Sequence, residues 1–484
     1  MDTEVIVRMP PSPTGSLHLG TARTALFNYL FAKHYKGKII FRWEDTDKER
    51  SHEKFEKEIL EGLKWLGMDF EKESEKIYRQ TENEPLHKEW LERLWEMGKI
   101  FPCFASQEAV EKERQKAKSE KRNFVFWSPY REETKQTLEK KIKSGESFVW
   151  RIRAPKNEEI IFGDLIRGKI SVNSATLGDF VIARADGSVL YLLANVLDDW
   201  TQHVTHVIRG EDHISNTPKQ ILLYHALGAS EPYFAHIPLV LDSQRRKLSK
   251  RNTDPSICVL IKDFQAAGFV PEGVVNGLAL LGWNPKSEKE IFSLEELVGI
   301  FDLKNVNPGA AQYNFEKMQW FNTHWMRTME IGKLREHFNV FSGKKLKSSD
   351  EEMIGFAREK AKNLQEIDSH LQYLTSDPGS DSALLINEKM GITLELAKKM
   401  LGEIEVMLEK MDEKKWTREN IQILSAQRIE ALGVKNGPFL NSFRIALSNR
   451  AVSMGPFEMA QVLGKKETLK RVKRAGGERG ATRN

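Results

Sequence analysis

Cysteine is scarce in this chain, since Cys103 and Cys258 are the only two among 484 residues. Two cysteines cannot supply a disulfide framework, which agrees with a reducing compartment. Also missing is any apolar run of the about 18 residues that a membrane-spanning helix needs. The first residues do not form the charged, apolar and small-residue succession of a secretory leader. We therefore expect a cytoplasmic protein with no membrane segment and no cleavable leader.

A strong net charge is lacking too. The formal net charge is +5, with 30% charged and 40% hydrophobic residues, which is typical of a globular protein. A chain of this length is too long for one hydrophobic core, so we expect two or more domains. Positive charge gathers at the end, where residues 465–484 hold eight Lys and Arg against two Glu. Such a segment suits a nucleic-acid backbone, although a solvated terminus is an equal alternative.

The first chemical motif is a turn that joins an apolar run to a helix. Residues 5–7 (Val-Ile-Val) predict a buried strand, and prolines and glycines punctuate residues 10–20. Beyond Gly20, apolar residues recur at three- and four-residue spacing, which predicts a helix. The N–H groups and positive dipole end of that helix would lie beside His18 and favour an anion such as phosphate. The alternative is an ordinary tight turn of any α/β protein.

The second motif is the basic pentapeptide Lys-Leu-Ser-Lys-Arg at residues 247–251. Lysine is a mobile point charge that can follow negative charge as it moves during phosphoryl or adenylyl transfer. A loop of this kind can therefore close over a polyphosphate. Taken alone, such a pentapeptide is more often a solvated basic loop.

Together the two motifs resemble the signatures of class I aminoacyl-tRNA synthetases, with the HIGH region at residues 18–21 and the KMSKS region at residues 247–251. Thr21 stands where the class signature has a second histidine, which is similar to the glutamyl branch. Over nearly its whole length the chain resembles bacterial glutamyl-tRNA synthetase. Five ordered segments carry this likeness: Pro-Ser-Pro-Thr-Gly (11–15), Trp-Glu-Asp-Thr-Asp (43–47), Tyr-Leu-Leu-Ala-Asn-Val (191–196), Val-Ile-Arg-Gly-Glu-Asp (207–212) and Asn-Thr-Pro-Lys-Gln (216–220).

The resemblance implies an enzyme that attaches L-glutamate to tRNA(Glu) in two steps. Glutamate would first react with ATP, accompanied by Mg²⁺, and the glutamyl group would then pass to the terminal ribose of the tRNA. Two alternatives stay open: an enzyme that also charges tRNA(Gln), and a catalytically silent relative that only binds RNA. A small-molecule nucleotidyltransferase with a similar turn would not explain the additional helical residues at the end of the chain. We expect a monomer.

The residue types at the strand ends fit a site for glutamate. This substrate carries two carboxylates and one ammonium, so its site needs cations and at least one anion. Arg8 and Arg209 each end an apolar run, and a guanidinium can bind a carboxylate in bidentate fashion. Glu44 can take the ammonium. The alternative is that each of these residues is simply solvated, as is common for a charged residue at a strand end. The resemblance implies the glutamate-binding residues Arg8, Ser12, Glu44, Tyr191, Asn195 and Arg209.

The resemblance also implies the residues that act on ATP. The implied catalytic residues are His18, Lys247 and Lys250: His18 and Lys250 would act on the phosphates, and Lys247 would help to close the loop. The implied ATP-binding residues are Ser12, Gly15, His18, Gly20, Thr21, Asp212, Lys247, Leu248, Ser249, Lys250 and Arg251.

Many members of the family carry zinc in a segment inserted into the catalytic domain. This chain keeps Cys103, but a rough alignment puts Ala105, Tyr130 and Glu132 where the other ligands would be. A structural zinc site needs about four nitrogen or sulfur donors. We therefore expect no structural zinc and no other metal site.

The fold class that follows is α/β: a Rossmann-type class I synthetase catalytic domain with an inserted α+β acceptor-binding subdomain, followed by all-α domains. An α/β nucleotide-binding sheet would bring His18, Glu44 and Arg209 together at the carboxyl ends of its strands. The expected parts are the catalytic domain (1–84 and 191–252), the insertion (85–190), a stem-contact domain (253–325), and two helical anticodon-binding domains (326–380, and 381–484 with the basic tail).

Residues 358–364 are predicted to be helical and are similar to the anticodon-proximal segment of the family, which makes Arg358 and Lys360 the anticodon candidates. Lys360 stands where many relatives that accept only glutamate tRNA have arginine. Lysine lacks the planar fork that reads a base edge, so discrimination at the third anticodon position would relax. The alternative is that Lys360 is a solvated helix charge.

Overall fold

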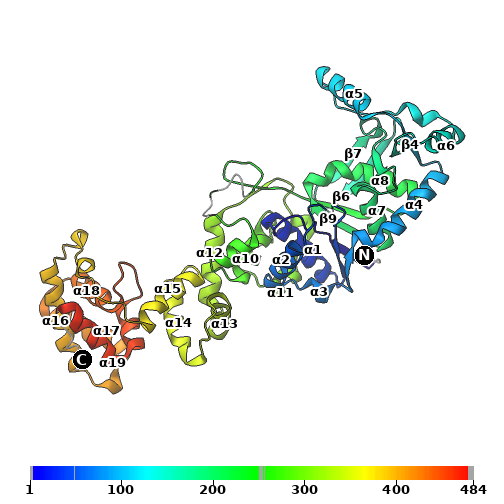
Figure 1. Cartoon of the computed structure of the whole chain (residues 1–484). Helices are drawn as coiled ribbons and strands as arrows, with labels where there is room; N and C mark the ends of the chain where they lie inside the picture. The colour runs from blue at the N-terminus through cyan, green and yellow to red at the C-terminus, as the bar shows by residue number, and fades with distance from the viewer. Residues whose placement is uncertain (1–3, 48, 250–253, 255–256, 478–484) are drawn as a thin grey trace. The chain divides into compact units, whose positions relative to one another are not determined.

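The computed structural model describes residues 4–47, 49–249, 254 and 257–477. The chain divides into two compact units, shown in Figure 1 from blue to red along the sequence. The first unit comprises Met1–Phe264 with Val274–Lys317, and the second comprises Gln265–Gly273 with Met318–Asn484.

A seven-stranded sheet in the order β3-β2-β1-β9-β10-β6-β7 forms the centre of the first unit. All neighbouring strands are parallel except the β6–β7 pair. The strand predicted at residues 5–7 is confirmed by β1. The strands are β1 (Ile6–Met9), β2 (Lys38–Trp43), β3 (Ile77–Arg79), β6 (Glu159–Asp164), β7 (Gly168–Asn173), β9 (His206–Gly210) and β10 (Tyr233–Ile237).

Helices connect and cover these parallel strands. Helix α1 (Leu19–His34) packs against β1, β2 and β9, as expected for a helix with apolar residues around most of its surface. Helices α7 (Tyr191–Thr201) and α8 (Thr217–Leu227) share a buried cluster with β2, β9 and β10. Helix α2 (Glu53–Trp65) follows β2, and α1 confirms the helix predicted beyond Gly20.

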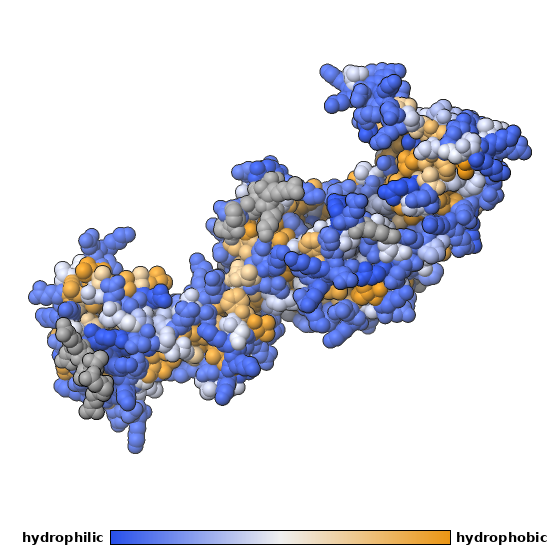
Figure 2. Space-filling view, viewed as in Figure 1, coloured by the Kyte–Doolittle hydropathy of each residue, from blue (hydrophilic) through white to orange (hydrophobic). Residues whose placement is uncertain are grey.

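The stretch predicted as an insertion contains a small antiparallel sheet in the order β4-β5-β8, formed by β4 (Ile100–Cys103), β5 (Val149–Ile152) and β8 (Val181–Arg184). A tight turn at Asp186-Gly187 follows β8: Arg184 N donates to Ser188 O, and Gly187 has φ +83°. Helices α4 (Glu84–Glu96), α5 (Gln107–Ser119) and α6 (Lys135–Lys143) belong to the same stretch, and α4 and α6 pack against β4. Figure 2 shows that α5 presents a hydrophilic surface.

The hairpin β6–β7 comes from the same stretch but joins the central sheet, where β6 pairs with β10. This pairing was not predicted from the sequence. Farther along the first unit, β11 (Val240–Leu241) pairs with β12 (Ala311–Gln312), and α11 (Leu294–Ile300) lies against α1. Helices α9 (Ile261–Ala266), α10 (Pro271–Leu280) and α12 (Phe315–Thr328) lie where the chain passes between the units.

The described part of the second unit is helical, as predicted. Its further α-helices are α13 (Ile331–Ser342), α14 (Glu351–Arg358), α15 (Leu364–Thr375), α16 (Leu394–Glu409), α17 (Arg418–Leu432), α18 (Asn436–Ser448) and α19 (Pro456–Gly476). One buried cluster includes residues before and after the break at 376–380. None of the described helices is long and apolar enough to cross a bilayer.

The continuous helix predicted through residues 358–364 is wrong. Helix α14 ends at Arg358, and α15 begins at Leu364 with Asn363 as its N-cap, whose side chain accepts from Glu366 N at 2.8 Å. An asparagine that caps the next helix competes with helix continuation, which explains the break. Lys360 therefore lies in an exposed loop.

The basic segment at the end of the chain is helical as far as residue 476. Its cations largely bind their own unit: Arg471 is buried and donates to Tyr373 O and Leu447 O, and Lys473 pairs with Glu409 at 2.8 Å. These side chains thus contribute to the packing of α19. Residues 478–484 lie outside the described part of the chain.

Candidate active site

A cavity of about 830 Å³ opens at the carboxyl edge of the central sheet. It brings together residues from β1, the start of α1, β9 and the segment after β11. Most of the predicted site residues line it: Arg8, Ser12, Gly15, His18, Gly20, Thr21, Glu44, Tyr191, Arg209, Asp212, Lys247, Leu248 and Ser249. Asn195 lies behind Glu44 and is not part of the lining. Lys250 and Arg251 fall outside the described residues.

His18 is the N-cap of α1, and its ring is oriented by the backbone. Nδ1 accepts from Gly20 N at 3.1 Å, so the proton of the neutral ring resides on Nε2. Nε2 is buried and has no hydrogen-bond partner among the described residues. Burial, and then the nearby charge of Lys247, lower the pKa of His18, which favours the neutral ring. His18 can thus offer one N–H to a ligand oxygen.

The helix terminus offers fewer free N–H groups than the sequence suggested. Leu19 N donates to Val259 O at 2.9 Å, and Gly20 N is occupied by His18. Val259 follows the basic loop, so this bond ties the loop's far end to the start of α1. Anion binding here therefore depends on side chains as well as on the helix dipole.

The start of the basic pentapeptide is fixed by a tight turn. The carboxylate of Asp242 accepts from the backbone N–H groups of Gln244 and Arg246, and Leu248 N donates to Val240 O at 2.9 Å. Lys247 is 63% exposed at its side chain and lies 3.2 Å from Asp212. This pair at the cavity rim is weak enough to exchange for a ligand phosphate.

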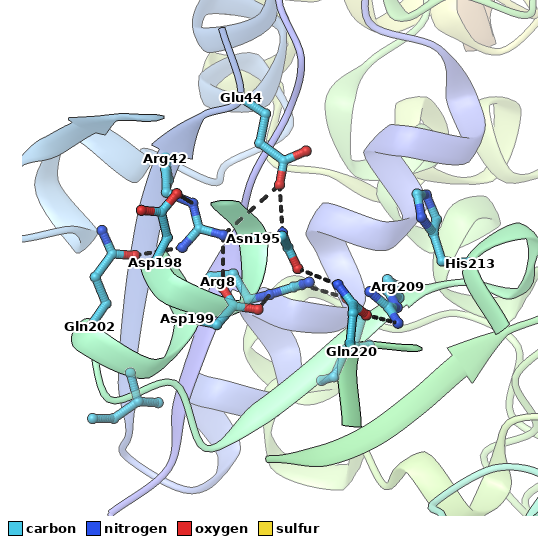
Figure 3. A network of polar contacts seen from close by, with 12 residues as sticks. Arg8, Arg42, Glu44, Asn195, Asp198, Asp199, Gln202, Arg209, His213 and Gln220 are labelled. Carbon is cyan, nitrogen blue, oxygen red and sulfur yellow. Dashed lines mark hydrogen bonds and ion pairs between the residues drawn. The ribbon is translucent and has the colours of Figure 1, made fainter. Parts of the chain in front are cut away.

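Arg8 is held by a buried ionic network beneath the cavity, shown in Figure 3. Its Nε lies 3.3 Å from Asp199, and Arg42 Nη2 lies 2.7 Å from the other oxygen of the same carboxylate. Arg42 also lies 3.7 Å from Asp198. Burial opposes the charge on Arg42, but the neighbouring carboxylates raise its pKa above the ordinary value. The network thus fixes the position of Arg8 and leaves part of its guanidinium available to a ligand.

Glu44 places a carboxylate in the cavity wall, and Asn195 orients it. Asn195 Nδ2 donates to Glu44 Oε1 at 2.8 Å, and Gln220 Nε2 donates to Asn195 Oδ1 at 2.9 Å (Figure 3). Burial raises the pKa of Glu44, although Arg42 and Arg8 oppose this effect. A ligand ammonium would favour the carboxylate form further.

Arg209 reaches the cavity from β9. Its Nη2 donates to Thr217 Oγ1 at 2.8 Å and to Gln220 Oε1 at 2.7 Å, whereas Nη1 has no partner within the described part of the chain. Residue Arg209 is only 5% exposed. A buried guanidinium nitrogen without a partner is costly, so this geometry indicates an anionic ligand.

Tyr191 and His213 form a polar pair at the same wall. Burial lowers the pKa of His213 to about 4 and raises that of Tyr191 to about 12, so both are neutral near pH 7. The Tyr191 hydroxyl lies 3.1 Å from His213 Nδ1 and can donate to it. The phenolic oxygen then remains available as an acceptor for a ligand.

The two anticodon candidates lie in the second unit. Arg358 is half-buried, and its Nη1 donates to Met329 O at 2.9 Å. Lys360 is exposed in the loop that follows.

The side chain of Cys103 is hydrogen-bonded to a serine. Its sulfur accepts from the Ser128 hydroxyl at 3.2 Å, and Arg131 pairs with the buried Asp179 nearby. Among the described residues no group of three or more His, Cys, Asp or Glu could hold a metal ion. The lack of structural zinc stays a prediction.

Several residues of the site were missed by sequence reasoning. Charged residues inside otherwise apolar segments could have revealed some of them. These are Arg42 within the buried strand β2, and Asp198-Asp199 on the apolar helix α7. His236 and Asp164 gave no comparable signal, since nothing local showed that His236 contacts Arg209 or that Asp164 contacts His236.

Two protein-family models match this chain. A family model described as tRNA synthetases class I (E and Q), catalytic domain, matches residues 4–320, and an anticodon binding domain matches residues 316–476. The glutamate–tRNA ligase of Aquifex aeolicus is 40% identical over 98% of this chain and 98% of its own length. Glutamate–tRNA ligase 2 of Caldicellulosiruptor saccharolyticus is 38% identical over 97% of this chain and 98% of its own.

A solved structure supports the same family. The crystal structure of a glutamate tRNA ligase from Elizabethkingia meningosepticum in complex with its amino acid is 29% identical, with a TM-score of 0.85. It covers 98% of this chain and 99% of its own. These proteins are named as ligases, which disfavours the alternative of a catalytically silent RNA-binding relative.

Proposed function

Since the chain belongs to the class I tRNA synthetases for glutamate and glutamine, and within them to the glutamate–tRNA ligases, we propose that its cavity activates L-glutamate with ATP. The observation that carries the proposal is the convergence of His18, Lys247 and the Arg8–Glu44–Arg209 group on one cavity. Phosphate-binding and carboxylate-binding groups are thereby within reach of a single pair of substrates.

In the first step, an oxygen of the α-carboxylate of glutamate attacks the α-phosphorus of ATP, and pyrophosphate leaves. Negative charge grows on the phosphate oxygens as the bond to the leaving group breaks. His18 donates its Nε2–H to these oxygens, while Lys247 moves from Asp212 toward the phosphates. Lys250, which lies outside the described residues, adds the second lysine charge.

Glutamate is selected by charge. Arg8 and Arg209 receive its two carboxylates, and Glu44, supported by Asn195, receives its ammonium. Tyr191 and Ser12 supply neutral hydrogen bonds at the same wall. Gly15, Gly20 and Thr21 let the nucleotide approach the backbone at the start of α1, and Asp212, Leu248 and Ser249 complete its site.

In the second step, a hydroxyl of the terminal ribose of tRNA(Glu) attacks the glutamyl carbonyl, and AMP leaves. We propose that residues 85–190 hold the acceptor end, that residues 253–325 contact the stem, and that residues 326–380 and 381–484 bind the anticodon arm, with Arg358 and Lys360 near the anticodon. The enzyme would act as a monomer in the cytoplasm, where tRNA is charged.

Mg²⁺ would enter with ATP and neutralise charge on its phosphates. The described residues hold no cage of carboxylates around the cavity. Phosphate oxygens and water would supply most of its ligands, which is how Mg²⁺ commonly binds with nucleotides.

Charging of tRNA(Glu) with radiolabelled glutamate tests the proposal when wild type is compared with Glu44→Gln. The substitution removes the counter-charge of the ammonium but keeps the shape, so the glutamate KM should rise about tenfold or more, equal to ~1.4 kcal/mol. The ATP KM should stay unchanged. Glu71→Gln, an exposed residue of the same unit, is the matched control. No charging by wild type, or equal effects of both variants, would contradict the proposal.

A further inference from the structure

The orientation of Arg209 is set by a buried residue that does not reach the cavity. Arg209 Nε lies 3.1 Å from His236 Nε2, on the neighbouring strand β10. Thr217 Oγ1 lies 3.0 Å from the same nitrogen, and it also accepts from Arg209 Nη2. With Nη2 and Nε held in this way, Nη1 is the guanidinium nitrogen left for a ligand.

The proton on His236 is placed by Asp164. Nδ1 of His236 lies 2.6 Å from Asp164 Oδ2, and the backbone N–H of His236 donates to that oxygen at 3.1 Å. An ionised carboxylate only accepts hydrogen bonds, so Nδ1 carries the proton. Burial lowers the pKa of His236 and favours the neutral ring, even though Asp164 opposes this effect. Nε2 therefore keeps a lone pair.

This tautomer matters because Arg209 Nε–H can only donate. A lone pair on His236 Nε2 accepts that bond, whereas a proton on Nε2 would set two N–H groups against each other across 3.1 Å. The other tautomer would push the guanidinium out of its present plane. A chain of hydrogen bonds thus runs from Asp164 through His236 to Arg209.

We propose that Asp164 and His236 are positioning residues that aim Nη1 of Arg209 at a carboxylate of glutamate. This inference rests on the proposed function, because it concerns amino-acid binding in the same cavity. Neither residue lines the cavity. Asp164 ends β6, so a hairpin from the stretch 85–190 supports amino-acid selection through β10.

Two substitutions of His236 separate positioning from packing. Asparagine places its amide near the position of Nδ1 and can still bond Asp164, but it leaves Arg209 Nε without an acceptor. Glutamine places its amide oxygen near the position of Nε2 and restores that acceptor. His236→Asn should raise the glutamate KM about tenfold or more, the effect expected when a hydrogen bond to a charged group is lost. The ATP KM should not change, and His236→Gln should recover most of the loss.

Asp164→Asn provides a second variant without any contact to Arg209. Asp164 Oδ1 accepts from Ile166 N and Arg167 N, so the amide oxygen of asparagine stays there and its nitrogen takes the place of Oδ2. The ring then loses the partner that holds the proton on Nδ1. It should raise the glutamate KM in the same direction as His236→Asn, and it carries the test if His236→Asn does not fold. His206→Asn, a buried histidine at the other end of β9, is the matched control and should leave the glutamate KM unchanged.

The measurement is glutamate-dependent exchange of pyrophosphate into ATP by the full chain with its tRNA, with melting temperatures as a check of folding. If His236→Asn and His236→Gln lose affinity equally, or if the KM values of ATP and glutamate rise together, the residue only packs and the proposal is wrong. An active wild type with an unaffected Asp164→Asn also overturns it. An inactive wild type would instead refute the proposed function itself.

Discussion

Replacing Arg42 by methionine should destabilise the first unit strongly, because this residue holds three buried carboxylates. Its guanidinium nitrogens lie 2.7 Å from Asp199, 3.7 Å from Asp198 and 3.9 Å from Glu44. With an effective dielectric constant of about 20, the nearest pair attracts by about 6 kcal/mol, which desolvation of the ions largely offsets. Methionine removes the nearest counter-charge of these carboxylates and leaves Asp199 with Arg8 alone, 3.3 Å away, which costs ~3–5 kcal/mol.

Arg79→Met on the adjacent strand β3 is the matched control. Arg79 also pairs with two carboxylates, Glu56 and Asp45, but its side chain is 36% exposed. Water screens such pairs, so the loss should be about 1 kcal/mol or less. Because the two units need not unfold together, hydrogen exchange of the β1 and β2 amides in the full chain is the suitable assay. Equal losses in the two variants would refute the role assigned to burial.

Four further predictions can be checked independently. Lys250→Ala should cut adenylate formation by more than tenfold, over ~1.4 kcal/mol, at an unchanged glutamate KM, and exchange kinetics with a raised KM and unchanged turnover would contradict its role. Lys360→Arg should improve discrimination of tRNA(Glu) from tRNA(Gln) by about ten- to a hundredfold in charging assays, and an unchanged ratio would remove Lys360 from anticodon reading. Burial lowers the pKa of His206 from 6.5 to about 4, so the unfolded chain takes up the proton first and stability falls as pH drops through this window. His206→Phe should remove about 1–2 kcal/mol of that loss near pH 5 in unfolding measurements, and an unaltered pH slope would exclude His206 as the cause. Elemental analysis should find no stoichiometric zinc, since Cys103 lacks companion ligands, and one zinc per chain would show that the alignment missed them.

The parallel core of the fold could be predicted because its signals are local. Strands β1, β2 and β9 are apolar runs with a charged residue at or beside their carboxyl end, and parallel strands bring such ends to one edge. This logic placed His18, Glu44 and Arg209 together, and the structure confirms that they line one cavity. The resemblance to glutamyl-tRNA synthetases, based on ordered motifs, is confirmed by the full-length relatives.

The remaining parts depend on contacts that sequence spacing does not encode. The pairing of β6 with β10 joins distant segments, so the relation of Asp164 to His236 could not be read from either. The buried charge of Arg42 is tolerated only because α7 supplies Asp198 and Asp199. The predicted helix through residues 358–364 failed for a local reason, the capping side chain of Asn363, which was visible but was outweighed by helical periodicity.

The central claim is that the cavity joins L-glutamate to ATP. Exchange of labelled pyrophosphate into ATP by the full chain, measured for each amino acid with and without tRNA(Glu), tests it most directly. The account predicts exchange that requires glutamate and is lost or strongly reduced when the charge of Arg209 is removed by Arg209→Gln. Exchange that proceeds equally with another amino acid, or no exchange with glutamate even when tRNA(Glu) is present, would contradict it.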